Sequence, residues 1–184
     1  MRELSLHILD IAENGINAGA DCIHILVEEA RTTDRLIIKI TDNGQGMPTE
    51  KIKKLTDSFV TSLTTRKVGL GLSLLAAAAE RCDGRLTVKT WPGTGTEVGA
   101  TFRYSHIDRA PMGDMAATIT TLIIGNPQID FVYTHIIDGE EFTLDTRELK
   151  AEMGNLSLTK PVVIYHLTAS IRNSLGKLIA KNGQ

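Results

Sequence analysis

The stretch Asp10-Ile11-Ala12-Glu13-Asn14-Gly15-Ile16-Asn17-Ala18-Gly19-Ala20 lies in a segment whose apolar side chains repeat with helical spacing. From Glu3 to Ala18 this spacing predicts an amphipathic helix that stops at Gly19. A second stripe on the same helix holds acceptor side chains and one histidine, namely Glu3, His7, Asp10, Asn14 and Asn17. Such a stripe is either a solvated face or a site for a hard cation, because Mg²⁺ prefers oxygen ligands. We expect Asn14 to supply one such oxygen and Asp10, one turn earlier, to orient or deprotonate a nucleophile.

Two further motifs follow a strand or open a helix. Asp42-Asn43-Gly44-Gln45-Gly46-Met47 comes directly after a predicted strand and is typical of either a turn or a ligand-binding loop. In such a loop Gly44 and Gly46 let the backbone approach a flat ring, and Asp42 accepts a hydrogen bond from an exocyclic amine. Gly69-Leu70-Gly71 opens a Leu- and Ala-rich helix, so unpaired backbone N–H groups face a phosphate-sized opening. Arg66 and Lys67, just upstream, are either solvated or close over a terminal phosphate.

The remaining pattern predicts an α+β fold. Strands are expected at 22–29, 35–42, 85–90 and 98–104, with helices at 50–55 and 71–81. The pattern then restarts with a helix at 111–124, a strand at 129–137, a hairpin turn into a strand at 140–144, a short helix and a last helix from Pro161. We therefore expect an N-terminal domain, 1–104, and a small α/β extension, 105–184. The apolar stripe of the last helix, Pro161 to Ala180, either packs inward or forms the seam of a homodimer.

Composition narrows the class of protein. Hydrophobic residues make up 42% and charged residues 23% of the 184 residues, which excludes a disordered chain. The sequence has no apolar run of about 18 residues, and its net charge of −2 includes no basic cluster. We therefore expect neither a membrane nor nucleic acid as a partner. The N-terminus lacks the apolar core of a signal peptide, so we expect a cytoplasmic protein.

The order of the motifs resembles that of the GHKL superfamily, which includes gyrase-type and mismatch-repair ATPases, Hsp90 chaperones and histidine kinases. Asp10-x-x-x-Asn14, Asp42-x-Gly44-x-Gly46, Gly69-x-Gly71 and Gly95-Thr96 match its N, G1, G2 and G3 boxes in order, within residues 1–104. The resemblance implies a Bergerat fold, an α/β sandwich in which helices cover one face of a mixed sheet. Its stand-alone members, the anti-sigma serine kinases and orphan ATP-binding proteins of anaerobic bacteria, are the most similar in architecture.

The resemblance also implies ATP and Mg²⁺ as ligands and a role for each matching residue. Asn14 would bind Mg²⁺, Asp42 would contact the adenine amino group, and Thr96 would bind the same water as Asp42. The loops that would enclose the nucleotide hold Gly44, Gly46, Gly69 and Gly71, with Met47 near the base and Arg66 and Lys67 at the terminal phosphate. Asp10 stands where gyrase-type enzymes carry a glutamate base, and aspartate is one methylene shorter.

The function that we expect is a regulatory kinase acting on a partner protein. An ATP-hydrolysing conformational switch and a non-catalytic adenine-nucleotide sensor are the alternatives. All three need the same nucleotide site, and they differ in whether phosphate goes to protein, to water or to neither.

Overall fold

The computed structural model describes residues 3–46, 70–153 and 158–181. The helices are α1 (Leu4–Asn17), α3 (Leu70–Arg81), α4 (Met115–Gly125), α5 (Thr146–Met153), α6 (Pro161–Lys181) and the short 3₁₀ helix η1 (Arg31–Thr33). The strands are β1 (Cys22–Ala30), β2 (Arg35–Asp42), β3 (Arg85–Trp91), β4 (Gly95–Arg103), β5 (Asp130–Ile137) and β6 (Glu140–Asp145). The helix expected at 50–55 lies outside the described residues. None of the described helices combines the length and the hydropathy needed to cross a membrane.

A single mixed sheet joins all six strands in the order β3-β4-β2-β1-β5-β6. Neighbouring strands are antiparallel except β1 and β5, which run parallel and pair from Cys22 with Asp130 to Glu29 with Ile137. The alternating strand after residue 105 therefore extends the sheet of the N-terminal strands instead of starting a second layer.

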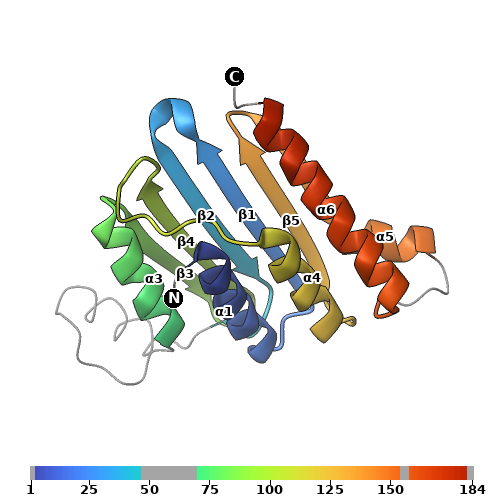
Figure 1. Ribbon diagram of the computed structural model, residues 1–184. Coiled ribbons are helices and arrows are strands. Elements are labelled where there is room, and N and C mark those ends of the chain that lie inside the picture. The colour runs from blue at the N-terminus through green and yellow to red at the C-terminus, as the bar shows by residue number, and fades with distance from the viewer. Residues whose placement is uncertain (1–2, 47–69, 154–157, 182–184) are drawn as a thin grey trace.

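Helices cover one face of this sheet. Figure 1 shows α3, α1, α4 and α6 lying side by side across it, and each contacts the next. Along β1 the buried residues Ile23, Ile25 and Val27 alternate with residues that keep some exposure, because successive strand side chains point to opposite faces. The structure thus confirms the α+β class and the mixed sheet with helices on one face.

The connection before α4 differs from the expected helix at 111–124, because α4 begins only at Met115. Gly113 has a φ of +84°, which a residue with a side chain rarely adopts, and a Cβ there would overlap Ser5 of α1. The carbonyl oxygens of Pro111 and Met112 accept hydrogen bonds from the backbone N–H groups of Leu4 and Ser5, at 3.0 and 2.8 Å. Pro111 and Met112 therefore cap the first turn of α1, because the side chain of its N-cap residue, Glu3, accepts no hydrogen bond from a backbone N–H of that turn.

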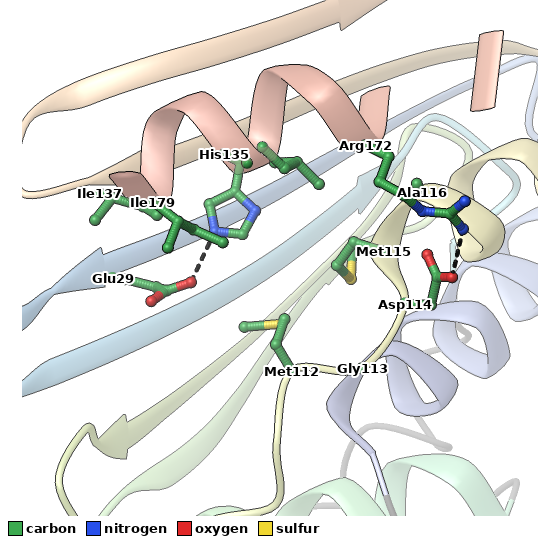
Figure 2. A pocket seen from close by; sticks show the side chains of 12 residues that line it. Glu29, Met112, Gly113, Asp114, Met115, Ala116, His135, Ile137, Arg172 and Ile179 are labelled. Atoms are coloured by element: carbon green, nitrogen blue, oxygen red, sulfur yellow. Dashed lines mark hydrogen bonds and ion pairs between the residues drawn. The ribbon is translucent and has the colours of Figure 1, made fainter. Parts of the chain in front are cut away.

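A buried polar chain links β1 with β5 beneath the helices. The Tyr133 hydroxyl and His135 Nδ1 are joined by a hydrogen bond of 2.7 Å. His135 Nε2–H donates to the Glu29 carboxylate at Oε1, 2.9 Å away (Figure 2). Arg31 donates to the other carboxylate oxygen of Glu29 at 3.2 Å. Burial opposes ionisation of Glu29, but the hydrogen bonds from His135 and Arg31 outweigh it and hold the pKa of this carboxyl below its usual value. Both ring nitrogens of His135 therefore have partners within the chain.

Candidate functional site

The C-terminal half of α1 lies directly against the residue that ends β2. Gly15 packs on Asp42 so closely that a Cβ at position 15 would lie 2.9 Å from the Asp42 Cβ atom. Glycine in the last turn of α1 therefore lets the helix backbone approach this carboxyl group. Asn14, which precedes Gly15, is exposed. The structure thus brings the C-terminal half of α1 against the Asp42 carboxyl group.

The same helix meets the start of α3 closer to its own N-terminus. A Cβ at Gly71, in the first turn of α3, would overlap the Asp10 Oδ2 atom. The Asp10 carboxylate therefore lies at the end of α3 where backbone N–H groups and the helix dipole favour negative charge. Positions 10 and 15 are about 7.5 Å apart along the helix axis. One stretch of α1 thus connects the Asp42 loop with the opening of α3.

Asp42 is held by the strand beside it and by its own loop. It pairs with Thr96 of β4, and its Oδ1 atom accepts a hydrogen bond from the backbone N–H of Gly44 at 3.0 Å. Burial raises the pKa of the Asp42 carboxyl, and the backbone N–H groups of Gly44 and Thr96 lower it by less. The Asp42 carboxylate is therefore a half-buried hydrogen-bond acceptor, and the two N–H groups offset only part of the cost of its burial. Such an acceptor favours a ligand group that donates a hydrogen bond.

The loop after Asp42 is fixed between α1 and the β3–β4 turn. Gln45 N–H donates to the Ala18 carbonyl at 2.9 Å, and Gly93 N–H donates to the Gln45 carbonyl at 2.8 Å. Gly44 is buried, and a Cβ there would lie 2.8 Å from the Ala18 oxygen. Gly46 has a φ of +66°. These contacts explain the glycines of the loop and hold its backbone in place before any ligand binds.

Thr96 is buried beside this loop and contacts a residue that the sequence analysis missed. Its hydroxyl donates to Thr90 Oγ1 at 3.2 Å, and Thr90 donates to the Gly95 carbonyl at 3.2 Å. Thr90 also lies beneath Gly46, where a Cβ would come within 3.0 Å of Thr90 Oγ1. The sequence offered one signal for Thr90. The turn between β3 and β4 has a predictable length, and this length pairs Thr90 with Thr96.

Several predicted site residues are not placed by the structure. Met47, Arg66, Lys67 and Gly69 lie outside the described residues. His7, a member of the polar stripe, is buried on α1, and its Nδ1 atom has no partner within residues 3–46, 70–153 and 158–181. Burial lowers the pKa of this imidazole.

Comparison with protein families gives a match over the part of the chain that holds this site. The family model described as "Histidine kinase-, DNA gyrase B-, and HSP90-like ATPase" matches residues 2–106, more than half of the chain. Sensor protein DegM of Bacillus sp. (strain B21-2) is 31% identical over 93 residues, which cover 50% of this chain and 24% of DegM. Sporulation kinase C of Bacillus subtilis (strain 168) is 30% identical over 94 residues, 51% of this chain and 22% of the kinase. The chain thus spans less than a quarter of the length of these curated relatives.

Two solved structures share the fold. The N-terminal domain of a DNA repair protein superposes with a TM-score of 0.53 at 18% identity, over 79% of this chain and 53% of that one. The Aquifex aeolicus MutL ATPase domain complexed with ADP superposes with a TM-score of 0.50 at 14% identity, over 79% of this chain and 63% of that one. At these identities the likeness concerns the fold alone.

Proposed function

The chain belongs to the histidine kinase-, DNA gyrase B- and HSP90-like ATPase family, and we propose that it binds Mg-ATP and acts as a regulatory kinase of a partner protein. The observation that carries this proposal is the position of α1, whose Gly15 packs on Asp42 and whose Asp10 packs on Gly71. The Asp42 carboxylate, which can accept a hydrogen bond from an amine, and the N-terminus of α3, which suits phosphate, thus lie beside the same short stretch of α1. We place the activity in the cytoplasm, where ATP is available.

The described residues fit an adenine nucleotide in their chemistry. The desolvated Asp42 carboxylate suits the exocyclic amine of adenine, because a donor from the ligand compensates its charge. The opening of α3 suits the phosphates, because its backbone N–H groups and helix dipole favour negative charge. Gly44 and Gly71 let the backbones of the loop and of α3 pack directly on Ala18 and Asp10 of α1. Thr96 would share a water with Asp42. The loops around Gly46, Met47 and Gly69 would complete the enclosure.

The donor set also fits a hard cation. Asn14 would hold Mg²⁺ through its exposed amide oxygen, with phosphate oxygens and water as the other ligands. When bound, the ion would neutralise charge on the phosphates. Arg66 and Lys67 would add positive charge at the terminal phosphate.

Asp10 would act as the base in phosphoryl transfer. Its carboxylate would take the proton of an incoming protein hydroxyl while the hydroxyl oxygen bonds to the terminal phosphorus and ADP leaves. The contact with Gly71 holds this carboxylate at the opening of α3, beside the expected phosphate position. Positioning by fixed elements would supply most of the catalytic effect.

The names of relatives favour a kinase, since one is a sensor protein and another a sporulation kinase. One observation favours a nucleotide sensor as the second candidate. Asp10 packs against α3 and has one methylene less than a glutamate, so its carboxylate has little freedom to follow a substrate. We also propose that residues 1–104 form the nucleotide-binding domain and that 105–184 form an α/β extension of it.

Incubation of the chain with γ-labelled ATP, Mg²⁺ and a lysate of the source cells separates the candidate functions. A kinase gives a labelled protein, and the Asp10→Asn variant should bind the nucleotide normally while losing the label. A hydrolytic switch gives labelled free phosphate only, and a sensor gives neither product. Either of the last two results would refute the kinase.

A further inference from the structure

A cavity of about 360 Å³ opens between α6, the segment before α4, and the strands β1 and β5 (Figure 2). This volume falls within the range of about 300–1,000 Å³ that is usual for the binding sites of small molecules. Glu29 of β1 lies within the residues that match the family model, and the other lining residues come after residue 106, where the match ends. Ligand sites occur preferentially where two such units meet. The position therefore favours a site for a small molecule outside the candidate nucleotide site.

Apolar side chains form most of the wall of this cavity. They come from α4 and the segment before it, from β5 and from α6, namely Met112, Met115, Ala116, Ile137, Leu175 and Ile179. Ile179 is 51% exposed, so a ligand beside it would remove apolar surface from water. The thioether sulfur of methionine makes favourable contacts with aromatic rings, and two methionines face this space. The wall therefore suits an aromatic ligand.

Gly176 leaves the α6 side of the cavity open. It lies one turn after Arg172 and one turn before Ile179, so the three residues share the face of α6 that lines the cavity. A Cβ at Gly176 would meet no atom within 4 Å. Glycine inside a helix is less stable than alanine, and no described neighbour requires it at this position. A flat ligand that lies against the α6 backbone would account for the glycine.

One part of the cavity is polar and buried. The Glu29 carboxylate and the His135 ring line it, and these side chains are 11% and 5% exposed. Glu29 accepts hydrogen bonds from His135 at 2.9 Å and from Arg31 at 3.2 Å. A carboxylate offers about four acceptor sites on its two oxygens. Glu29 can therefore accept a further hydrogen bond from a ligand in the cavity.

The charges around the cavity favour a neutral ligand. Arg31 forms an ion pair with Glu29 at 3.2 Å, and Arg172 forms one with Asp114 at 2.7 Å. Because each carboxylate already has a cation beside it, a charged ligand would lose its hydration without gaining an unpaired partner. The Arg172 side chain is 61% exposed at the rim, where its guanidinium can lie over the face of an aromatic ring.

We propose that this cavity binds a small neutral aromatic molecule with one hydrogen-bond donor, of the phenol or indole class. The donor bonds to Glu29, and the ring lies between Met112 and Met115 on one side and the α6 backbone at Gly176 on the other. An apolar cavity of about 150 Å³ in another protein holds benzene, so the larger volume here admits a molecule of two fused rings. None of the lining residues belongs to the candidate nucleotide site, so the two proposals stand or fall separately.

Titration of the ¹⁵N-labelled chain with indole, followed by the backbone amide signals in NMR spectra, tests this site. The amides of Gly113, Ala116 and Gly176 should shift and saturate, with a dissociation constant of about 0.1–1 mM for so small a ligand. Benzofuran has oxygen in place of the indole N–H and should bind at least tenfold more weakly, because an acceptor would then face the Glu29 carboxylate. Cyclohexanol should also bind at least tenfold more weakly, because it has a donor but no aromatic face.

Two variants and a control test the contacts. Gly176→Leu should abolish indole binding because leucine fills the open space, and its melting temperature should stay equal or rise because leucine favours a helix. In Glu29→Gln the preference for indole over benzofuran should disappear, because an amide donates as well as accepts hydrogen bonds. The control Lys177→Ala changes an exposed residue of α6 that does not line the cavity, and it should bind indole like the wild type.

Four results would overturn the proposal. The first is the lack of a saturable shift with indole up to about 5 mM. The second is a set of shifts confined to the surroundings of Gly44, which would place indole in the candidate nucleotide site. The third is wild-type affinity for indole in Gly176→Leu, and the fourth is equal affinity of the wild type for indole and benzofuran.

Discussion

Replacing Asp42 by asparagine tests the proposed contact with adenine most directly. The substitution keeps the shape of the side chain, and the amide oxygen can still accept the Gly44 N–H that now donates at 3.0 Å. The second carboxylate oxygen becomes an NH₂ group. Because the adenine amine is a donor, a donor would then face a donor.

The magnitude follows from the bond that is lost. A hydrogen bond to a charged group contributes about 1.5–3 kcal/mol, so the affinity for the nucleotide should fall roughly 10- to 150-fold. The stability of the free protein should change little, because two effects oppose each other. The substitution removes a carboxylate whose ionisation burial disfavours, but it also removes the acceptor of the Thr96 N–H. We expect the melting temperature to shift by less than about 3 °C.

Calorimetry with a non-hydrolysable ATP analogue measures this loss, with Asp108→Asn in an exposed loop as the matched control. The pH dependence gives a second readout. Burial raises the pKa of Asp42, so wild-type affinity should decline on acidification at a higher pH than an ordinary carboxyl would produce. Asp42→Asn should lack this component. An unchanged dissociation constant in the variant would refute the assignment of Asp42 to the nucleotide site.

Three further substitutions test other contacts. Gly71→Ala places a methyl group on the Asp10 Oδ2 position and should displace this carboxylate, so phosphoryl transfer should slow. The affinity for ADP, measured by calorimetry, should be retained. A wild-type rate of transfer would contradict the proposed position of the base. Tyr133→Phe leaves the buried His135 Nδ1 without its hydrogen-bond partner and should lower the free energy of unfolding in urea by about 1–3 kcal/mol. An unchanged free energy of unfolding would show that this hydrogen bond does not stabilise the protein. Glu29 has a folded-state pKa below its ordinary value of 4.5, so its contribution is present above that pH and lost as the pH falls through the folded pKa. Melting temperatures should therefore fall more steeply in acid for wild type than for Glu29→Gln, and parallel curves would argue against the lowered pKa.

The helices and strands that show a clear hydrophobic pattern in the sequence were predictable. The alternation in β1 and β2 and the apolar period of α1 reflect which face each residue buries, and this depends on near neighbours in sequence. The start of α4 was not predictable, although Met112 fits the helical period. Gly113 adopts a positive φ because residues 111–114 pack on the first turn of α1, a contact between segments more than a hundred positions apart.

The residues of the candidate site likewise fall into those that short sequence motifs predict and those that only the tertiary structure brings together. Asp42, Gly44 and Gly71 belong to short motifs, and each lies in a contact that its residue type explains. Thr90 was missed because its place beneath Gly46 arises from the pairing of β3 with β4 and from the path of a loop on a different strand. The alternation of strand 129–137 places His135 on the same face as Phe131 and Tyr133, and the structure buries that face. Its pairing with Glu29 was not predictable, because Glu29 comes from β1, more than a hundred positions earlier.

The parallel pairing of β1 with β5 has a consequence for the chain as it leaves the ribosome. Ala30 and Asp130 are 100 positions apart, so the outer edge of β1 is made long before the strand that will cover it. At about 5–20 residues per second this delay lasts about 5–20 s. During it the nascent chain presents an unpaired row of backbone donors and acceptors beside an apolar strand, which is the form most open to aggregation and to chaperone binding.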